Sequence, residues 1–451
     1  MAMWRVGAAA VLATGTAVVL VGAPAHANPG GSDVRTTPRA AFSTSVVISA
    51  SSTNQVQGSI SMPSSGSKVF SAVTHDKFSG NQVYGTAKSR TWTPGKGLGK
   101  LKVVGPARNS DATLVAANSS GKKVWFAFHQ TTGKWARVGV RRQVGKKLKK
   151  PNIFKIKGED AVPGALLQSK NASTAAFSYR AHRSSKEYVR IWQAGKGWSA
   201  AHRIQTNSAP FDQFAISADG STVMIVSTTP QNHVRSLMWT RSGGWQAPVR
   251  LVTTATTPIV RSALSADGRS AVVAWSAAPA WAYTDESVIT RTMSDGVWAP
   301  QQNILQNARV RAIAMSGEKY MFVAERYDLS QTGASDLVRY TVDSYPWVYP
   351  TQVGPSLQRL GSNEYVATVK FATAHDLSAN IVMWSAGQRK LKLRAASWTS
   401  AGGASPSTVV QLPGSNRNFD FAASADARRY AAQDSTNGRK GAVHAVHGVT
   451  R

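Results

Sequence analysis

Cysteine is absent from the 451 residues, and its absence excludes several kinds of chemistry. A chain without thiols forms no disulfides, offers no thiolate ligands to zinc and has no cysteine nucleophile or lipoprotein anchor. Small exported domains usually need disulfides because their cores are small, so this chain has to rely on a larger core. About 410 residues beyond the N-terminal segment suffice for two or three ordinary domains or for one large repeat fold.

Acidic residues are scarce, with 22 Asp and Glu against 53 Lys and Arg and a formal net charge of +31. Glycosidases work with paired carboxylates, and Asp219 and Asp267 are better explained as turn residues because glycine follows each of them. That direct Asp-Gly order also departs from the S-x-D-x-G-x-x-W box of sialidase-like propellers. The composition therefore argues against glycan cleavage and favours association with polyanions.

Motifs for nucleotide binding and for serine hydrolases are missing as well, so we expect no cofactor and assign no catalytic residue. His444 and His447 are three residues apart, a spacing that places them on opposite faces of a strand, and we expect no metal site. The His-Asp pairs at 75–76 and 375–376 each stand where a strand is expected to meet a loop. We interpret them as polar loop residues rather than as a base with its orienting carboxylate.

Long apolar runs are limited to residues 6–21, which follow Arg5 and lead to the small-x-small pattern that ends at Ala27. This pattern predicts a secretory signal peptide over 1–27, cleaved after Ala27. The run is short for a membrane span, which needs about 20 residues. We expect a secreted protein, extracellular or associated with the cell wall, with a flexible linker over 28–41.

What the sequence does contain is a repeat, marked by S-A-D-G at 217–220 and again at 265–268. Between the two copies, apolar and polar residues alternate or cluster as in short strands, and Asp-Gly and Gly-Gly pairs mark turns. The expected strands of this unit are FDQFAIS (211–217), STVMIVS (221–227), HVRSLMWT (233–240) and WQAPVRLV (245–252). The last carries a proline, as edge strands can.

The same plan divides the rest of the chain into units with a spacing of about 50 residues, which is typical of propeller blades. The expected units are 55–105, 108–157, 162–206, 210–253, 259–305, 307–354, 363–412 and 416–451. Residues six apart mark the turn between the third and fourth strands, as in Trp192 and Trp198, Trp239 and Trp245, and Thr292 and Trp298. We predict an all-β propeller of four-stranded antiparallel blades over 42–451, eight-bladed, with seven blades as the alternative.

The last unit holds three strands only, whereas FSTSVVISA (42–50) is a strand that belongs to no unit. We predict that 42–50 pairs with the strand near 441–449 and closes the ring, because an open ring would expose sheet edges.

The S-A-D-G turns, with a third copy S-A-D-A at 424–427, resemble the S-P-D-G turn of secreted TolB-type, WD40-like bacterial propeller repeats. The resemblance covers three units well and departs from the family in having Ala for Pro. The Gly-His and Trp-Asp pairs of eukaryotic WD40 repeats are missing too. The resemblance to TolB-type repeats implies a propeller architecture and no particular activity, since the family includes binding scaffolds and hydrolase-associated domains.

Positive charge is concentrated between Lys77 and Lys157, where 19 basic residues accompany a single acid, Asp111. We predict that this region binds polyanions. The candidate binding residues are Lys96, Lys100, Lys102, Arg141, Arg142, Lys146, Lys147, Lys149, Lys150, Lys155 and Lys157.

These features favour a secreted, non-catalytic binding module for anionic polymers, such as a cell-wall polymer, an acidic glycan or extracellular nucleic acid. Two alternatives stay open: a glycan-active hydrolase or lyase with its site in the central channel, and a protein-binding scaffold. Convergent carboxylates, His and Tyr at one mouth of the channel would indicate an enzyme. A channel lined by small and apolar residues would indicate a binding module.

Overall fold

The structure is a computed structural model of the whole chain. It describes residues 40–450 apart from 43–44, 51–54, 80–81, 107–109, 133–134, 158–160, 182–185, 205–212, 278–285, 328–334, 343–350, 353–356, 361–363, 375, 389, 414–418 and 436–441. The expected signal peptide over 1–27 and nearly all of the expected linker lie outside the described residues. In the described part no helix is long and apolar enough to cross a bilayer.

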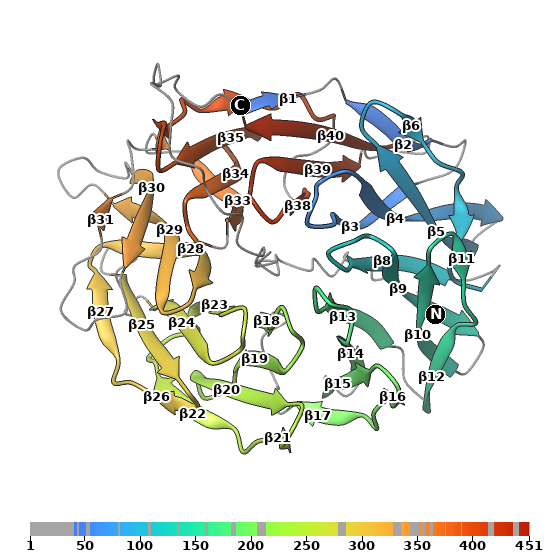
Figure 1. Ribbon diagram of the computed structural model, residues 1–451, viewed down its shortest axis with the longest axis horizontal. Helices are drawn as coiled ribbons and strands as arrows, with labels where there is room; N and C mark the ends of the chain where they lie inside the picture. Colours follow the sequence, from blue (N-terminus) through green and yellow to red (C-terminus); the bar gives the residue numbers. More distant parts are fainter. Residues whose placement is uncertain are drawn as a thin grey trace, which may run out of the picture.

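The described strands form eight antiparallel sheets, arranged as blades around a central axis in Figure 1. The strands of the first four blades, in order from the axis outward, are as follows: blade 1, β3 (Gln55–Ser61), β4 (Val69–Ser79), β5 (Gln82–Thr93), β6 (Gly97–Leu98) and β7 (Lys102–Val103); blade 2, β8 (Ser110–Ala117), β9 (Lys123–Thr132), β10 (Trp135–Val144), β11 (Lys147–Leu148) and β12 (Asn152–Lys157); blade 3, β13 (Ala161–Gln168), β14 (Thr174–Ala181), β15 (Lys186–Gln193), β16 (Gly197–Trp198) and β17 (His202–Ile204); blade 4, β18 (Gln213–Ile216), β19 (Thr222–Thr228), β20 (His233–Thr240), β21 (Gly244–Trp245) and β22 (Val249–Thr253).

The strands of the last four blades follow the same order: blade 5, β23 (Ile259–Leu264), β24 (Ser270–Ala277), β25 (Ser287–Ser294), β26 (Val297–Trp298) and β27 (Gln302–Leu305); blade 6, β28 (Ala308–Ser316), β29 (Lys319–Tyr327), β30 (Ser335–Val342), β31 (Thr351–Gln352) and β32 (Gln358–Leu360); blade 7, β33 (Tyr365–Thr373), β34 (Ala379–Gly387), β35 (Lys392–Thr399), β36 (Gly403–Ala404) and β37 (Thr408–Val409); blade 8, β38 (Asp420–Ala423), β39 (Arg429–Ser435) and β40 (Ala442–Thr450), with β1 (Ala40–Phe42) and β2 (Val46–Ala50). The prediction of eight four-stranded blades is confirmed, although blade 6 reaches Leu360 rather than residue 354.

The outer, fourth strand of each blade consists of two short pieces that both pair with the third strand, as β6 and β7 pair with β5. Short, interrupted outer strands offer little unpaired backbone to another chain, which protects a sheet edge from aggregation. The turn before the fourth strand varies in length. Trp192 faces Trp198 and Trp239 faces Trp245 as expected, but Met293, not Thr292, faces Trp298. Blade 5 has a two-residue turn here, with Asp295 and Gly296 both at positive φ, as type I′ hairpins require.

The repeated S-A-D-G stretch forms the turn between the first two strands of a blade. In the copy that starts at Ser217, the serine Oγ donates to Asp219 Oδ1 (2.7 Å), and that carboxylate accepts from the backbone N–H of Ser221 (2.9 Å). Gly220 has a φ of 69°, and a Cβ there would lie 2.7 Å from Thr174 Oγ1 of the preceding blade. The aspartate and glycine therefore serve the turn and its contact with the neighbouring blade.

These turns are joined from blade to blade by backbone hydrogen bonds. Each bond runs from the N–H of one turn to the C=O of the next: Ala425 to Ser64 (3.0 Å), Ser64 to Ser119 (2.9 Å), Ser119 to Lys170 (3.0 Å), Lys170 to Ala218 (2.9 Å) and Ala218 to Ala266 (2.7 Å). We call this series the turn chain. It links blades 8, 1, 2, 3, 4 and 5 at one end of the propeller.

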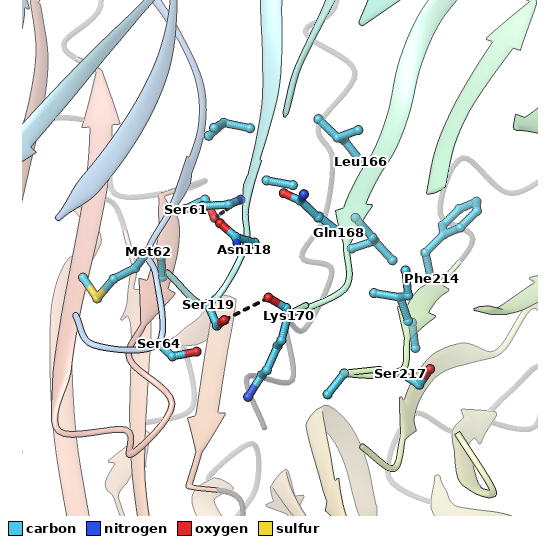
Figure 2. Close-up of a pocket in the computed structure, with 18 of the residues that line it drawn as sticks. Ser61, Met62, Ser64, Asn118, Ser119, Leu166, Gln168, Lys170, Phe214 and Ser217 are labelled. Carbon is cyan, nitrogen blue, oxygen red and sulfur yellow. Dashed lines mark hydrogen bonds between the residues drawn. The ribbon is translucent and has the colours of Figure 1, made fainter. Parts of the chain in front are cut away.

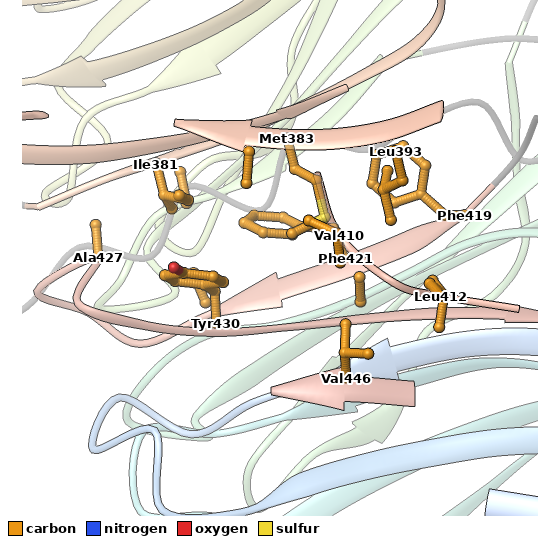
Figure 3. Packing of buried hydrophobic residues seen from close by; sticks show 14 residues of the cluster. Ile381, Met383, Leu393, Val410, Leu412, Phe419, Phe421, Ala427, Tyr430 and Val446 are labelled. Carbon is orange, nitrogen blue, oxygen red and sulfur yellow. The ribbon is translucent and has the colours of Figure 1, made fainter. Parts of the chain in front are cut away.

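Apolar side chains fill the spaces between blades. Figure 3 shows one such space, where Ile381, Met383 and Leu393 of blade 7 pack toward Tyr430 and Val446 of blade 8. Every blade has two apolar faces, since strand residues alternate sides, and each face is covered by a neighbouring blade.

The N-terminal strands complete blade 8. β2 pairs antiparallel with β40 from Val46–Ala445 to Ala50–Ala442, and β1 continues along the same strand, as Figure 1 shows near the C-terminus. The predicted closure of the ring is confirmed; its first strand begins at Ala40. Ile48 on β2 is fully buried between blades 8 and 1, whereas its neighbour Val47 is 42% exposed.

This closure predicts unequal effects of truncating two adjacent residues. Ile48→Ala removes a buried side chain from the blade 8–blade 1 space and should lower the free energy of unfolding by about 2–5 kcal/mol. Val47→Ala should change it by about 0.5 kcal/mol or less, because surface substitutions rarely do more. Chemical denaturation of both variants measures the difference, and equal midpoints would show that the strand does not seal the ring.

A candidate basic surface on blades 1 and 2

Six of the predicted polyanion-binding residues have exposed side chains on the outer hairpins of blades 1 and 2. They are Lys96, Lys100, Lys146, Lys147, Lys149 and Lys150. Lys96 lies in the turn between β5 and β6, Lys146 lies in the turn of the β10–β11 hairpin, and Lys147 is the first residue of β11. Gly145, with a φ of 58°, opens this two-residue turn and leaves Lys146 at its apex. We call these six lysines the basic surface.

The two hairpins lie side by side. Lys102 Nζ on β7 donates to the backbone O of Lys146 (3.2 Å) and to Gln143 Oε1 (3.4 Å). Arg141 Nε donates to the backbone O of Lys149 (2.7 Å), and its Nη1 lies 3.4 Å from the backbone O of Val103. Two of the predicted binding residues thus hold the hairpins of blades 1 and 2 together.

Arg142 points the other way, into the space between blades 2 and 3. Its guanidinium carbon lies 4.4 Å from the centroid of Trp192 and 5.5 Å from that of Trp125. Such stacking is a cation–π contact. Desolvation by burial lowers the pKa of Arg142 below its usual value. Its charge serves the packing of the two blades rather than the surface.

The remaining two predicted residues, Lys155 and Lys157, belong to β12, where their backbones face Arg137 and Trp135 of β10. Their side chains lie outside the described part of the structure. One further lysine, Lys122, was missed by the sequence analysis. Its side chain is exposed, and its backbone O accepts from Gly145 N (2.7 Å), so it stands next to the hairpin tip. Its position in a turn between the first two strands was the signal that could have found it.

A recurring arginine accounts for some of the remaining positive charge. Arg90, Arg141 and Arg291 occupy the same place on the third strand of blades 1, 2 and 5. In each, Nε donates to a fourth-strand carbonyl of its own blade, at Gly99 (2.9 Å), Lys149 (2.7 Å) and Ala299 (2.7 Å). Nη1 donates to the outer strand of the preceding blade, at Ile48 (2.7 Å), Val103 (3.4 Å) and Leu251 (3.0 Å). We call this contact the arginine clasp.

The partners in the arginine clasp are neutral carbonyls, so the clasp holds blades together without cancelling any charge. Five ion pairs lie in blades 5 to 8. They join Arg269 to Asp295, Arg309 to Glu286, Arg311 to Glu325, Arg359 to Asp336 and Lys370 to Asp420. In blades 1 and 2, Arg90 and Arg141 therefore keep their positive charge while they bind carbonyls.

The histidines considered above fall in different places. The pair at 75–76 lies within β4 rather than at its end, opposite Thr86 and Gly85 of β5, so the expectation of a strand–loop junction was wrong. His375 lies outside the described residues. The ring of His447 packs edge-on against Trp92 at 6.0 Å, and burial lowers the pKa of both His444 and His447. Among the described residues no group of three potential metal ligands converges.

Comparison with known proteins identifies no family. No family model matches the chain, and no curated protein does. Among solved structures, the chain is similar to a prolyl endopeptidase (TM-score 0.49, 13% identity, 85% of this chain and 54% of that one). It is also similar to the BP39L lectin from Burkholderia pseudomallei (TM-score 0.47, 12% identity, 81% and 100%) and to TolB from Acinetobacter baumannii (TM-score 0.30, 14% identity, 56% and 55%). The chain spans about half the length of the prolyl endopeptidase. It is a β-propeller that these comparisons assign to no specific family.

The arginine clasp predicts that the shape of the side chain matters as well as its charge. Arg291→Lys keeps the charge but loses the planar fork that reaches two carbonyls, and should destabilise the protein by about 1–3 kcal/mol. Arg250→Lys, at an exposed position of β22, is the matched control and should have no measurable effect. Thermal unfolding measures the melting temperatures of both variants. Equal melting temperatures would mean that the arginine clasp does not stabilise the ring.

Proposed function

We propose that this protein is an exported, non-catalytic binding module whose basic surface associates with anionic polymers outside the cell. The proposal rests chiefly on one observation: six exposed lysines gather on two adjacent hairpins that hydrogen bonds from Lys102 and Arg141 hold together. Candidate partners are a cell-wall polymer, an acidic glycan or extracellular nucleic acid, all of which present repeated negative charges.

The geometry of the hairpin tip supports contact with an extended ligand. Lys146 lies in the hairpin turn, Lys147 comes directly after it, and Lys149 and Lys150 follow Leu148; all four lysines are exposed. Lysine carries its charge on a flexible stem, which suits irregular polymers better than a single shaped ligand. The chain from Lys77 to Lys157 supplies one acid to offset this charge, so the local field stays positive.

One cavity on the central channel also lacks the paired carboxylates of a glycan-cleaving enzyme. This cavity, at one end of the channel, is lined by apolar and small residues such as Ile60, Val115 and Leu264, together with Asn118, Gln168 and Lys170. Glycoside hydrolysis needs two convergent carboxylates, and this lining contributes amide, hydroxyl and ammonium groups instead. The protein-binding scaffold has no comparable observation in its favour.

The test removes the four charges at the tip. Lys146, Lys147, Lys149 and Lys150, all changed to Gln, should weaken binding to a short DNA duplex, which serves as a defined polyanion. The slope of log affinity against log salt should fall by about 0.9 for each phosphate that the variant no longer neutralises. Fluorescence anisotropy at several salt concentrations measures both quantities. Thermal stability should barely change, because exposed charges contribute little to folding.

The matched control changes four exposed cations on other blades: Arg250, Lys319, Lys390 and Lys392, each to Gln. It lowers the net charge by the same amount but leaves the basic surface intact, so DNA affinity should fall much less. Equal losses in both variants would reduce the effect to net charge and contradict a site on blades 1 and 2. Repeating the series with teichoic acid and heparin distinguishes the classes of polymer.

A further inference from the structure

A cavity of about 70 Å³ lies at the end of the central channel where the turn chain joins the blades. Figure 2 shows it between the inner strands of blades 1 to 4, with Ser64, Ser119 and Lys170 in neighbouring turns. Apolar side chains including Met62, Leu166 and Phe214 form much of its wall. This cavity lies on the channel and shares no residue with the basic surface.

At this cavity, two residues of blade 3, Gln168 and Lys170, differ in type from the residues at the equivalent positions of other blades. The six equivalent turn positions joined in the turn chain are Ser64, Ser119, Lys170, Ala218, Ala266 and Ala425, so Lys170 is the one long side chain among small ones. The position two residues earlier holds Gln168, where the neighbouring blades 2 and 4 have Ala117 and Ile216. Alanine makes the same turn and the same backbone bonds, so the fold does not require the lysine.

Both residues line the cavity, and Figure 2 shows the Lys170 ammonium pointing away from the Gln168 amide. Gln168 is the last residue of β13, and Lys170 lies in the turn that follows. Within the described residues, Lys170 Nζ, both polar atoms of the Gln168 amide and Ser64 Oγ are buried without a hydrogen-bond partner. Buried polar atoms in folded proteins are nearly always satisfied by protein, water or a ligand, so these four atoms are available to whatever occupies the cavity.

The electrostatics identify the sign of a ligand for this cavity. Among the described lining residues Lys170 is the one titratable side chain, and no carboxylate there balances it. Desolvation by burial lowers the pKa of Lys170 to about 7. A buried ammonium without a counter-charge is unfavourable, and a bound anion would supply the counter-charge and restore the protonated form.

We propose that the channel cavity binds the carboxylate of a small organic acid, with Lys170 as its cationic anchor and the Ser64 hydroxyl as a hydrogen-bond donor. The apolar wall then contacts a short hydrocarbon tail. An apolar cavity of about 150 Å³ holds benzene, so a cavity of about 70 Å³ suits an acid of propionate size. Inorganic anions lack the tail and should bind less well.

The test is calorimetric titration of the whole protein with propionate, with propionamide as the uncharged control of the same shape. Wild-type protein should bind propionate and not propionamide. Lys170→Met, which replaces the lysine by an uncharged side chain of similar length, should weaken propionate binding at least tenfold. Chloride and phosphate should bind more weakly than propionate. The proposal is wrong if the amide binds as well as the acid, or if Lys170→Met binds like wild type.

Two further readouts separate a ligand site from a structural lysine. Because the folded-state pKa of about 7 lies below the unfolded value near 10.5, the unfolded chain holds the proton more tightly. The ammonium therefore opposes folding below pH 10.5, and Lys170→Met should raise the melting temperature of the ligand-free protein. A lower melting temperature would assign Lys170 a structural role and overturn the proposal. Propionate affinity should also fall by about tenfold or more between pH 6 and pH 8.5, as Lys170 loses its proton.

Chemical labelling tests the site without any substitution. An amine with a pKa near 7 is largely unprotonated at neutral pH, so reductive methylation should modify Lys170 faster than Lys146, which is exposed on the basic surface. Propionate should slow the labelling of Lys170 and leave Lys146 unchanged, as measured by peptide mass spectrometry. Equal protection of both lysines would show non-specific association and contradict a built site.

Discussion

The structure depends on one constraint: each blade has two apolar faces, and neither is covered until the neighbouring blade is in place. Contacts such as those of Ile381 and Met383 with Tyr430 exist only between blades, so a single blade has no core of its own. The ring must therefore close, and the chain closes it by pairing β2 with β40, some 400 residues away along the sequence. The turn chain adds directional hydrogen bonds to this apolar packing. It joins blade 8 to blade 1 and continues through blades 2, 3 and 4 to blade 5 at one end of the propeller.

This constraint also shapes the distribution of charge. Arginines that reach from one blade to the next need acceptors at the outer strands, and those acceptors are backbone carbonyls. Carbonyl partners satisfy the guanidinium without neutralising it, so each clasp leaves a net positive charge on the protein. Part of the +31 charge thus belongs to the construction of the ring. The lysines of the basic surface differ from these arginines because they are exposed and sit on hairpin tips.

The same reasoning separates residues that look alike in the sequence. Arg141 and Arg142 are adjacent, yet Arg141 binds carbonyls across blades 1 and 2 while Arg142 stacks on Trp192 of blade 3. Successive residues of a strand point to opposite faces, and each face meets a different neighbouring blade. A count of basic residues therefore overstates the charge available to a ligand. Lys170 is the converse case, because its burial depends on turns from three blades that meet at the channel.

The sequence by itself determined the architecture. Alternating apolar residues, Asp-Gly turns and a period of about 50 residues are local or periodic features, which can be read without knowing the fold. They predicted eight blades, the turn role of Asp219 and Asp267, and the strand that completes blade 8. Only the tertiary structure decided which cations face solvent, which clasp carbonyls, and that Gln168, Lys170 and Ser64 surround one cavity. The physical reason is that the environment of a side chain is set by residues about 50 positions away, on the next blade, and not by its neighbours in the chain.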